Sequence, residues 1–328
     1  MGRTLLRFLT CIVLAATSLP AVAIADPVET TVEAPGPKGA LKGLMLSPGT
    51  ADAPVVLIVP GSGPVNRDGS SLHGLSAATY KLLAEGLAAR DIASVRIDKR
   101  GMFSSAAAIP NANDVTIADY AADIHTWVAA IRQQTGAKCV WVLGHSEGGL
   151  VAMAAAKDNP PDICGLLLVA APGRKFGELI KDQLRSNPAN APILDEALHD
   201  IDELEAGRRV DVSNARPEMQ GIFAPAVQGF LIDLFSYDPP KLLAAYKGPV
   251  LILQGERDIQ VGIDDARRLK AADEAAKLVL LPDVNHVLKE VDTDERMANL
   301  RTYVNAKLPL APGVVDALAD FVTAAKSP

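Results

Sequence analysis

The chain has 328 residues, of which 49% are apolar and 22% charged, a balance typical of a globular protein and not of a disordered one. Aromatic residues make up only 4%, so the core is expected to consist mainly of Ala, Val, Leu and Ile. The formal charge of -7 leaves no basic footprint, which argues against nucleic acid as a partner.

Residues 1–25 predict an export signal. The cationic start MGRTLLR precedes an apolar stretch and small residues that allow cleavage after Ala23 or Ala25. A membrane anchor is the alternative, but Pro20 interrupts the apolar run, which is short for a spanning helix of roughly 20 residues. Because no later segment is long and apolar enough to span a bilayer, we expect an exported protein, periplasmic or secreted, that is not held in a membrane.

From residue 26 to residue 173, strand-like and helix-like segments alternate. Strands are predicted over 43–48, 54–63, 92–101, 138–146 and 163–173, and helices over 78–91, 116–136 and 147–160. Continuous apolar runs such as PVVLIV are typical of strands that are buried on both faces. The alternation predicts an α/β fold with a mostly parallel sheet and helices on both of its faces.

Between residues 174 and 245 the alternation stops, and charged amphipathic helical pieces surround the apolar stretch GIFAPAVQGFLIDLF. Strands resume over 248–258 and 276–286, and an amphipathic helix follows. We therefore predict a core of residues 26–173 and 246–328 with a helical cap inserted at 174–245. The apolar stretch is expected to pack the cap onto the core, and lining a substrate pocket is the alternative.

Cys139 and Cys164 each stand seven residues before the point where an apolar strand ends, taken as Ser146 and Ala171. If the two strands are parallel neighbours about 4.8 Å apart, the thiols lie within reach of a disulfide. An exported protein would meet conditions that permit such a bond. Two buried free thiols remain the alternative.

The carboxyl ends of the predicted strands carry nearly all the polar or glycine-rich clusters of the core: PGSGP, DKRG, GHSEGG, AAPG, GERD and DVNH. Ligands bind at this edge in open parallel sheets, so we expect the functional site there. Within GHSEGG, Ser146 fits the G-x-S-x-G pattern of a tight strand-to-helix turn that exposes a serine hydroxyl. The same turn places the backbone N–H of Glu147 at a helix N-terminus, where it can stabilise an oxyanion. A packing corner with an inert serine is the alternative.

A serine nucleophile needs a base, and the base needs a carboxylate that orients it. His286 follows the last predicted strand at the correct edge, whereas His199 lies in the cap. Asp258 ends the preceding strand and is preferred to its rivals Glu256 and Asp283, of which Asp283 is too close to the histidine on the same loop.

A second oxyanion donor is expected from the glycine-rich loop PGSGP, and we assign it to the backbone N–H of Ser62. Asp98, Lys99 and Arg100 in DKRG are expected to brace a loop and not to take part in catalysis. His145, beside the predicted nucleophile, is expected to pack or to form structural hydrogen bonds.

Together, GSGPVNRDG, RIDKRG, LGHSEGG, GERDIQV and NHVLK resemble bacterial serine carboxylesterases of the α/β-hydrolase superfamily. The group with a G-S-G-P-x-x-R-D loop is the most similar one, and it is related to thioesterase-like and serine-aminopeptidase-like hydrolases. The resemblance covers roughly residues 41–175 and 245–325 and leaves the cap unmatched. It implies the following site: Ser146 as nucleophile, His286 as base, Asp258 as acid, and Ser62 with Glu147 as oxyanion donors.

The expected activity is hydrolysis of a small-molecule carboxylic ester through an acyl-serine, with no metal or organic cofactor. The same triad could cleave a thioester or an amide, although export weakens an acyl-CoA substrate because that cofactor is intracellular. A catalytically idle binding protein of this fold is the alternative from a different class. Such a protein has no need of a serine, an acid and a histidine in this order.

Overall fold

The computed structural model describes residues 26–72 and 74–325. The predicted signal peptide, residues 1–25, lies outside this part of the chain. The described strands form one eight-stranded sheet with the order β1-β2-β4-β3-β5-β6-β7-β8. Their bounds are Val28–Ala34 (β1), Leu41–Ser47 (β2), Val55–Val59 (β3), Ala93–Ile97 (β4), Val140–His145 (β5), Ile163–Val169 (β6), Val250–Gly255 (β7) and Lys277–Leu281 (β8).

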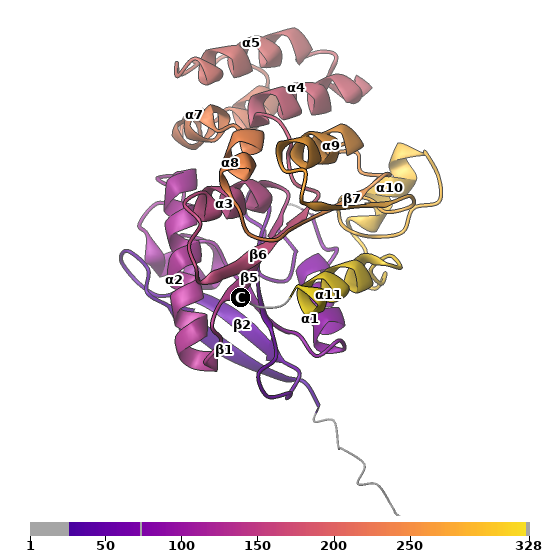
Figure 1. Ribbon diagram of the computed structural model, residues 1–328. Helices are drawn as coiled ribbons and strands as arrows, with labels where there is room; N and C mark the ends of the chain where they lie inside the picture. Colours follow the sequence, from indigo (N-terminus) through magenta and orange to yellow (C-terminus); the bar gives the residue numbers. More distant parts are fainter. Residues whose placement is uncertain (1–25, 73, 326–328) are drawn as a thin grey trace, which may run out of the picture.

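Helices cover both faces of this sheet, with α2 and α3 on one face and α1 and α11 on the other (Figure 1). The helices of the core are Thr79–Ala88 (α1), Phe103–Ala108 (η1), Ile117–Thr135 (α2), Glu147–Ala156 (α3), Ile263–Ala272 (α9), Arg296–Thr302 (α10) and Val314–Ala324 (α11). Those between β6 and β7 are Phe176–Ser186 (α4), Pro188–Asn190 (η2), Leu194–Glu205 (α5), Pro217–Ile222 (α6), Gln228–Ser236 (α7) and Pro239–Ala245 (α8). No helix in the described ranges is long and apolar enough to cross a membrane.

Strands β3 to β8 pair in parallel, as the alternating pattern predicts, whereas β1 and β2 extend one edge by antiparallel pairing. Every residue of β3, β5 and β6 is buried, because these central strands have a layer of helices on each side. The prediction of an α/β fold is thus confirmed. Strand β1 was not predicted, because its sequence VETTVEA has five exposed residues and no apolar run.

Residues at the two ends of α2 show how the local sequence determines where a helix begins and ends. Thr116 caps the helix by accepting the backbone N–H of Asp119, and the Asp119 carboxylate accepts the backbone N–H of Thr116 in return. Gly136 ends the helix with a φ of 75°, a left-handed conformation that a residue without a Cβ adopts readily. These ends agree with the predicted range of 116–136.

Helices α4 to α8 gather at the end of the molecule beyond α3 (Figure 1). The apolar stretch of this region mainly packs inward, as expected: Phe223 and Phe235 are each 1% exposed, and both belong to the cluster that includes α3. Among the large apolar side chains of this stretch, Ile222 is exposed and lines a cavity.

Cys139 and Cys164 form a disulfide, with their Cα atoms 5.1 Å apart. Of the two alternatives left open by the sequence, the structure contains the bonded one. The cysteines lie at the amino ends of the neighbouring strands β5 and β6. Ser146 follows the opposite end of β5, so the disulfide is remote from the predicted site.

Candidate active site

Ser146 lies in a strained turn between β5 and α3. Its backbone has a φ of 56° and a ψ of -124°, which residues with side chains rarely adopt and which costs roughly 1–3 kcal/mol. The flanking glycines are required by close backbone contacts. A Cβ on Gly144 would lie 2.3 Å from the carbonyl oxygen of Gly148, and one on Gly148 would lie 2.4 Å from that of Val59. This close packing forces the chain to turn sharply at Ser146.

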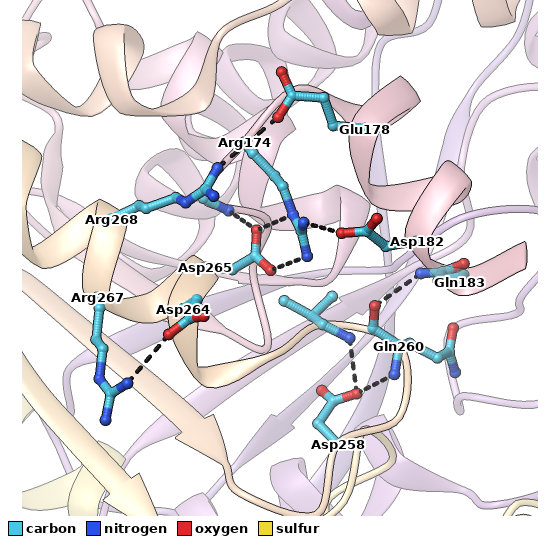
Figure 2. Close-up of polar contacts among 12 residues, drawn as sticks. Arg174, Glu178, Asp182, Gln183, Asp258, Gln260, Asp264, Asp265, Arg267 and Arg268 are labelled. Carbon is cyan, nitrogen blue, oxygen red and sulfur yellow. Dashed lines mark hydrogen bonds and ion pairs between the residues drawn. The ribbon is translucent and has the colours of Figure 1, made fainter. Parts of the chain in front are cut away.

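His286 and Asp258 meet at the same edge of the sheet. The distance between His286 Nδ1 and Asp258 Oδ2 is 2.8 Å, and both side chains are buried. The other carboxylate oxygen, Oδ1, accepts the backbone N–H groups of Gln260 at 2.7 Å and Val261 at 2.9 Å (Figure 2). The side chain of Gln254 donates to Oδ2 at 3.2 Å. These bonds hold the carboxylate in one orientation toward the imidazole.

The rival residues occupy other places. Asp283 is exposed and pairs with Arg257 at 3.7 Å, and Glu256 is also exposed. His199 lies on the exposed side of α5. Among the described residues, Asp258 is therefore the carboxylate that contacts His286.

Ser146 and His286 line one cavity of about 600 Å³. The Ser146 hydroxyl forms no hydrogen bond with any residue in the described ranges. In catalytic sites the hydrogen bond between a serine and its base is often completed only when substrate binds. Gly61 and Ser62 of the PGSGP loop belong to the same lining. The predicted nucleophile, base and oxyanion loop thus face a common space.

One face of α4 forms a wall of this cavity. Its lining residues recur at helical spacing: Phe176, Leu179, Ile180, Gln183 and Leu184. No role was predicted for these residues, although their spacing of three and four positions indicates that they share one face of a helix. The wall is mainly apolar, with side-chain amides of Gln183, Asn187 and Asn190 toward the C-terminal end of the helix and just beyond it.

The helical insertion is tied to the core close to this site (Figure 2). Arg174, just before α4, pairs with the buried Asp265 of α9 at 3.1 Å and also with Asp182. Farther along α4, Gln183 donates its side-chain amide to the backbone carbonyl of Gln260 at 2.9 Å. Since Gln260 also holds Asp258, the insertion contacts the loop that carries the predicted acid.

His145 links three elements of the site through hydrogen bonds, as the structural role expected for it requires. Its Nε2 lies 2.8 Å from the backbone carbonyl of His286, which can only accept, so Nε2 carries the proton. Burial lowers the pKa of His145 to about 3, so the ring is neutral and its Nδ1 accepts the Tyr80 hydroxyl at 3.0 Å. The Tyr80 oxygen in turn accepts the backbone N–H of Gly61 at 2.9 Å. This chain connects the oxyanion loop to the histidine loop.

Because His145 is buried and neutral, we expect the free energy of unfolding to decrease as the pH is lowered. The unfolded histidine has a pKa near 6.5 and the folded one about 3, so between these values the unfolded chain binds more protons. The free energy of unfolding should therefore decrease by up to about 1.4 kcal/mol per pH unit as the pH falls from 6.5 toward 3. Urea unfolding at several pH values measures this slope. His145→Gln should have a shallower slope, and an equal slope would contradict the assignment.

The DKRG loop has a closer relation to the site than the sequence analysis expected. Asp98 and Arg100 do brace the structure: Asp98 accepts the backbone N–H of Arg67 at 2.8 Å, and Arg100 donates to Asp123 at 2.6 Å. Lys99, however, is buried and directs its ammonium group to Gly61 and Glu147. Lys99 thus braces a loop as expected, but the loop is the glycine-rich one after β3, and its second partner begins α3. These groups can meet because β4, β3 and β5 are consecutive strands in the sheet.

No group of His, Cys, Asp and Glu side chains in the described part of the chain is arranged to hold a metal ion.

Residues 56–299 match the model of the alpha/beta hydrolase family, so the chain belongs to that family. Comparison with functionally curated protein sequences gave no significant match.

Solved structures with this fold include several esterases. Est1E from Butyrivibrio proteoclasticus is 16% identical with a TM-score of 0.55, and the match covers 90% of this chain and 98% of that one. The esterase Pf2001 from Pyrococcus furiosus is 14% identical with a TM-score of 0.55, covering 93% and 99%. The alpha/beta hydrolase GrgF from Penicillium sp. sh18 is 18% identical with a TM-score of 0.58, covering 90% and 98%. At these identities the likeness concerns the fold.

Proposed function

We propose that this alpha/beta hydrolase is a serine esterase that cleaves carboxylic esters through an acyl-serine intermediate. In this proposal Ser146 is the nucleophile, His286 the general base and Asp258 the acid that orients the base. The observation that carries it is the 2.8 Å contact between His286 and Asp258 in a cavity that Ser146 shares with His286. The strained turn at Ser146 supports the same role.

The proposed reaction has two halves. His286 Nε2 takes the proton of Ser146 as its oxygen attacks the ester carbonyl carbon, and the backbone N–H groups of Ser62 and Glu147 bind the resulting oxyanion. The tetrahedral intermediate collapses, and His286 gives the proton to the departing alcohol. Water then attacks the acyl-serine and gives a proton to His286, and a second tetrahedral intermediate forms. When it collapses, the bond to the Ser146 oxygen breaks, His286 returns the proton to that oxygen, and the carboxylic acid leaves.

The finer classification is also part of the proposal. We place the chain among the bacterial carboxylesterases with a G-S-G-P-x-x-R-D loop because GSGPVNRDG, GHSEGG and the NHVLK stretch resemble that group. The names of Est1E and Pf2001 as esterases support ester cleavage, and the apolar wall of α4 supports an apolar acyl group.

Hydrolysis of p-nitrophenyl esters from acetyl to palmitoyl tests this function. Each added CH₂ that contacts the α4 wall should raise kcat/KM by up to about fourfold, following about 0.8 kcal/mol per buried CH₂, until the cavity is filled. The p-nitroanilide and the thioester of the best acyl group serve as comparisons. Hydrolysis of none of the esters would contradict the proposal, and faster cleavage of the anilide or thioester would reassign the bond that is broken.

We further propose that the protein acts after export. The pattern of residues 1–25 and the disulfide between Cys139 and Cys164 both support an oxidising compartment outside the cytoplasm. Mass spectrometry of the protein from fractionated cells should find a chain that begins at Ile24 or Asp26. A chain that begins at Met1 and remains in the cytoplasm would contradict export.

A further inference from the structure

Gly61 is held at both of its backbone polar groups. Its N–H donates to the Tyr80 hydroxyl oxygen at 2.9 Å, and its carbonyl accepts a proton of the Lys99 ammonium at 2.7 Å. The residue also packs against the predicted nucleophile, since a Cβ on Gly61 would lie 3.1 Å from the Cβ of Ser146. The conformation of this short segment is therefore tightly determined beside the reacting atom.

The bond to Lys99 sets the direction of the next N–H group. The described residues contain no cis peptide, and the carbonyl and N–H of a trans peptide point in opposite directions. Because the Gly61 carbonyl faces the buried Lys99, the N–H of Ser62 points to the opposite side of the same peptide, and both residues line the cavity. This N–H forms no hydrogen bond with a described residue and is free to bind an oxyanion.

Lys99 also contacts the residue that supplies the second proposed donor. Its ammonium lies 3.2 Å from Glu147 Oε1, and Glu147 is the first residue of α3, where backbone N–H groups have no partner within the helix. The Lys99 and Glu147 side chains are only 4% and 1% exposed. The ring of Tyr120 packs 5.4 Å from the ammonium. The Lys99 ammonium and the Glu147 carboxylate are thus buried as an ion pair, in which each side chain compensates the charge of the other.

We propose that Lys99 is a positioning residue for the oxyanion hole, bridging the Gly61 carbonyl and the Glu147 carboxylate and thereby fixing the N–H groups of Ser62 and Glu147 relative to each other. The inference rests on the proposed ester hydrolysis. The two donors follow different strands, β3 and β5, and Lys99 follows β4, which neighbours β3 on its other side. A cation on the Gly61 carbonyl also polarises that peptide and strengthens the Ser62 N–H as a donor.

The experiment removes both charges together. Lys99→Met alone would leave Glu147 buried and unpaired, so the test uses the double variant Lys99→Met/Glu147→Gln, which keeps the lengths of the two side chains. The matched control is Arg100→Met/Asp123→Asn, because Arg100 of the same loop forms a buried ion pair with Asp123 of α2 that touches neither Gly61 nor Glu147. Thermal unfolding followed by circular dichroism establishes that each variant is folded.

The double variant should lose about 10- to 100-fold in kcat with KM changed less than about threefold, since removing one oxyanion donor outright costs about 10²- to 10³-fold and here the donors are displaced. A trifluoromethyl ketone, which forms an oxyanion on the serine, should bind more weakly by the same factor. The corresponding methyl ketone should bind as before. The control pair should keep kcat within about threefold.

If the double variant does not fold, Glu147→Gln alone replaces it in the experiment. This single variant leaves Lys99 bonded to Gly61, so kcat and the affinity for the trifluoromethyl ketone should each fall only a few-fold.

Unchanged kcat and ketone affinity in the folded variants would overturn the inference. An equal loss in the control pair would also overturn it, because the effect would then belong to the stability of the loop. If the wild type hydrolyses no ester, the proposed function fails separately. The rate at which a fluorophosphonate labels Ser146, whose phosphoryl oxygen enters the same oxyanion hole, then decides the inference: slower labelling of the double variant supports it, and equal labelling overturns it.

Discussion

Replacing Ser146 by alanine is expected to reduce kcat for p-nitrophenyl esters on the order of 10⁵- to 10⁶-fold, because no other group can take over the attack. The remaining rate would come from the oxyanion donors and from binding. The fold should be unaffected, since the hydroxyl of Ser146 has no hydrogen-bond partner among the described residues. Steady-state assays combined with fluorophosphonate labelling measure the loss, and the variant should carry no label.

The control for this substitution is Ser213→Ala, which removes an exposed hydroxyl from the loop before α6. This variant should hydrolyse esters and accept the label as the wild type does. A Ser146→Ala protein that keeps more than about a hundredth of the wild-type kcat would contradict the nucleophile. It would favour the catalytically idle reading of the turn, with hydrolysis occurring elsewhere on the protein.

Asp258→Asn is expected to lower kcat about 10⁴-fold while leaving KM little changed. Its Oδ1 must continue to accept the backbone N–H groups of Gln260 and Val261, so the new NH₂ group replaces Oδ2 and faces His286. That NH₂ can only donate, and His286 Nδ1 must then accept. The imidazole proton moves to Nε2, which can no longer take the proton of Ser146. Asp258 is not part of the cavity lining, so substrate binding should persist.

Kinetics and the NMR shifts of the His286 ring nitrogens together test this tautomer change. Asp283→Asn is the matched control, because Asp283 precedes the same histidine but is exposed and pairs with Arg257. It should keep kcat within about threefold. A loss of less than tenfold in Asp258→Asn would transfer the acid's role to another carboxylate and would leave the 2.8 Å contact as a structural one.

Several features could be predicted because their causes lie close together in the sequence. The apolar run before Ser146, the flanking glycines and the Ala-rich segment after it specify a strand, a sharp turn and a helix within about one βα unit. The polar ends of successive strands likewise indicated which edge carries the site, since parallel strands share that edge. The contact between Asp258 and His286, 28 residues apart, follows from two such neighbouring strand ends.

Other features escaped prediction because the pattern was weak or the partners were remote. Strand β1 is polar and exposed, so only its pairing with β2 defines it. From the sequence, α4 could be recognised only as a charged amphipathic helix, and the structure shows that its apolar face lines the cavity. The apolar wall of the cavity is therefore a property of tertiary packing.

The α/β pattern, the serine turn and the order of the proposed triad residues could be recognised in the sequence, because each depends on backbone preferences and spacing within short segments. The contacts of Lys99 depend on the three-dimensional arrangement of the strands. Its partners Gly61 and Glu147 lie 38 and 48 residues away, and they meet it only because β4, β3 and β5 are adjacent in the sheet. The DKRG pattern predicted a loop brace, and only the order of the strands shows that Lys99 is buried and which two acceptors it contacts.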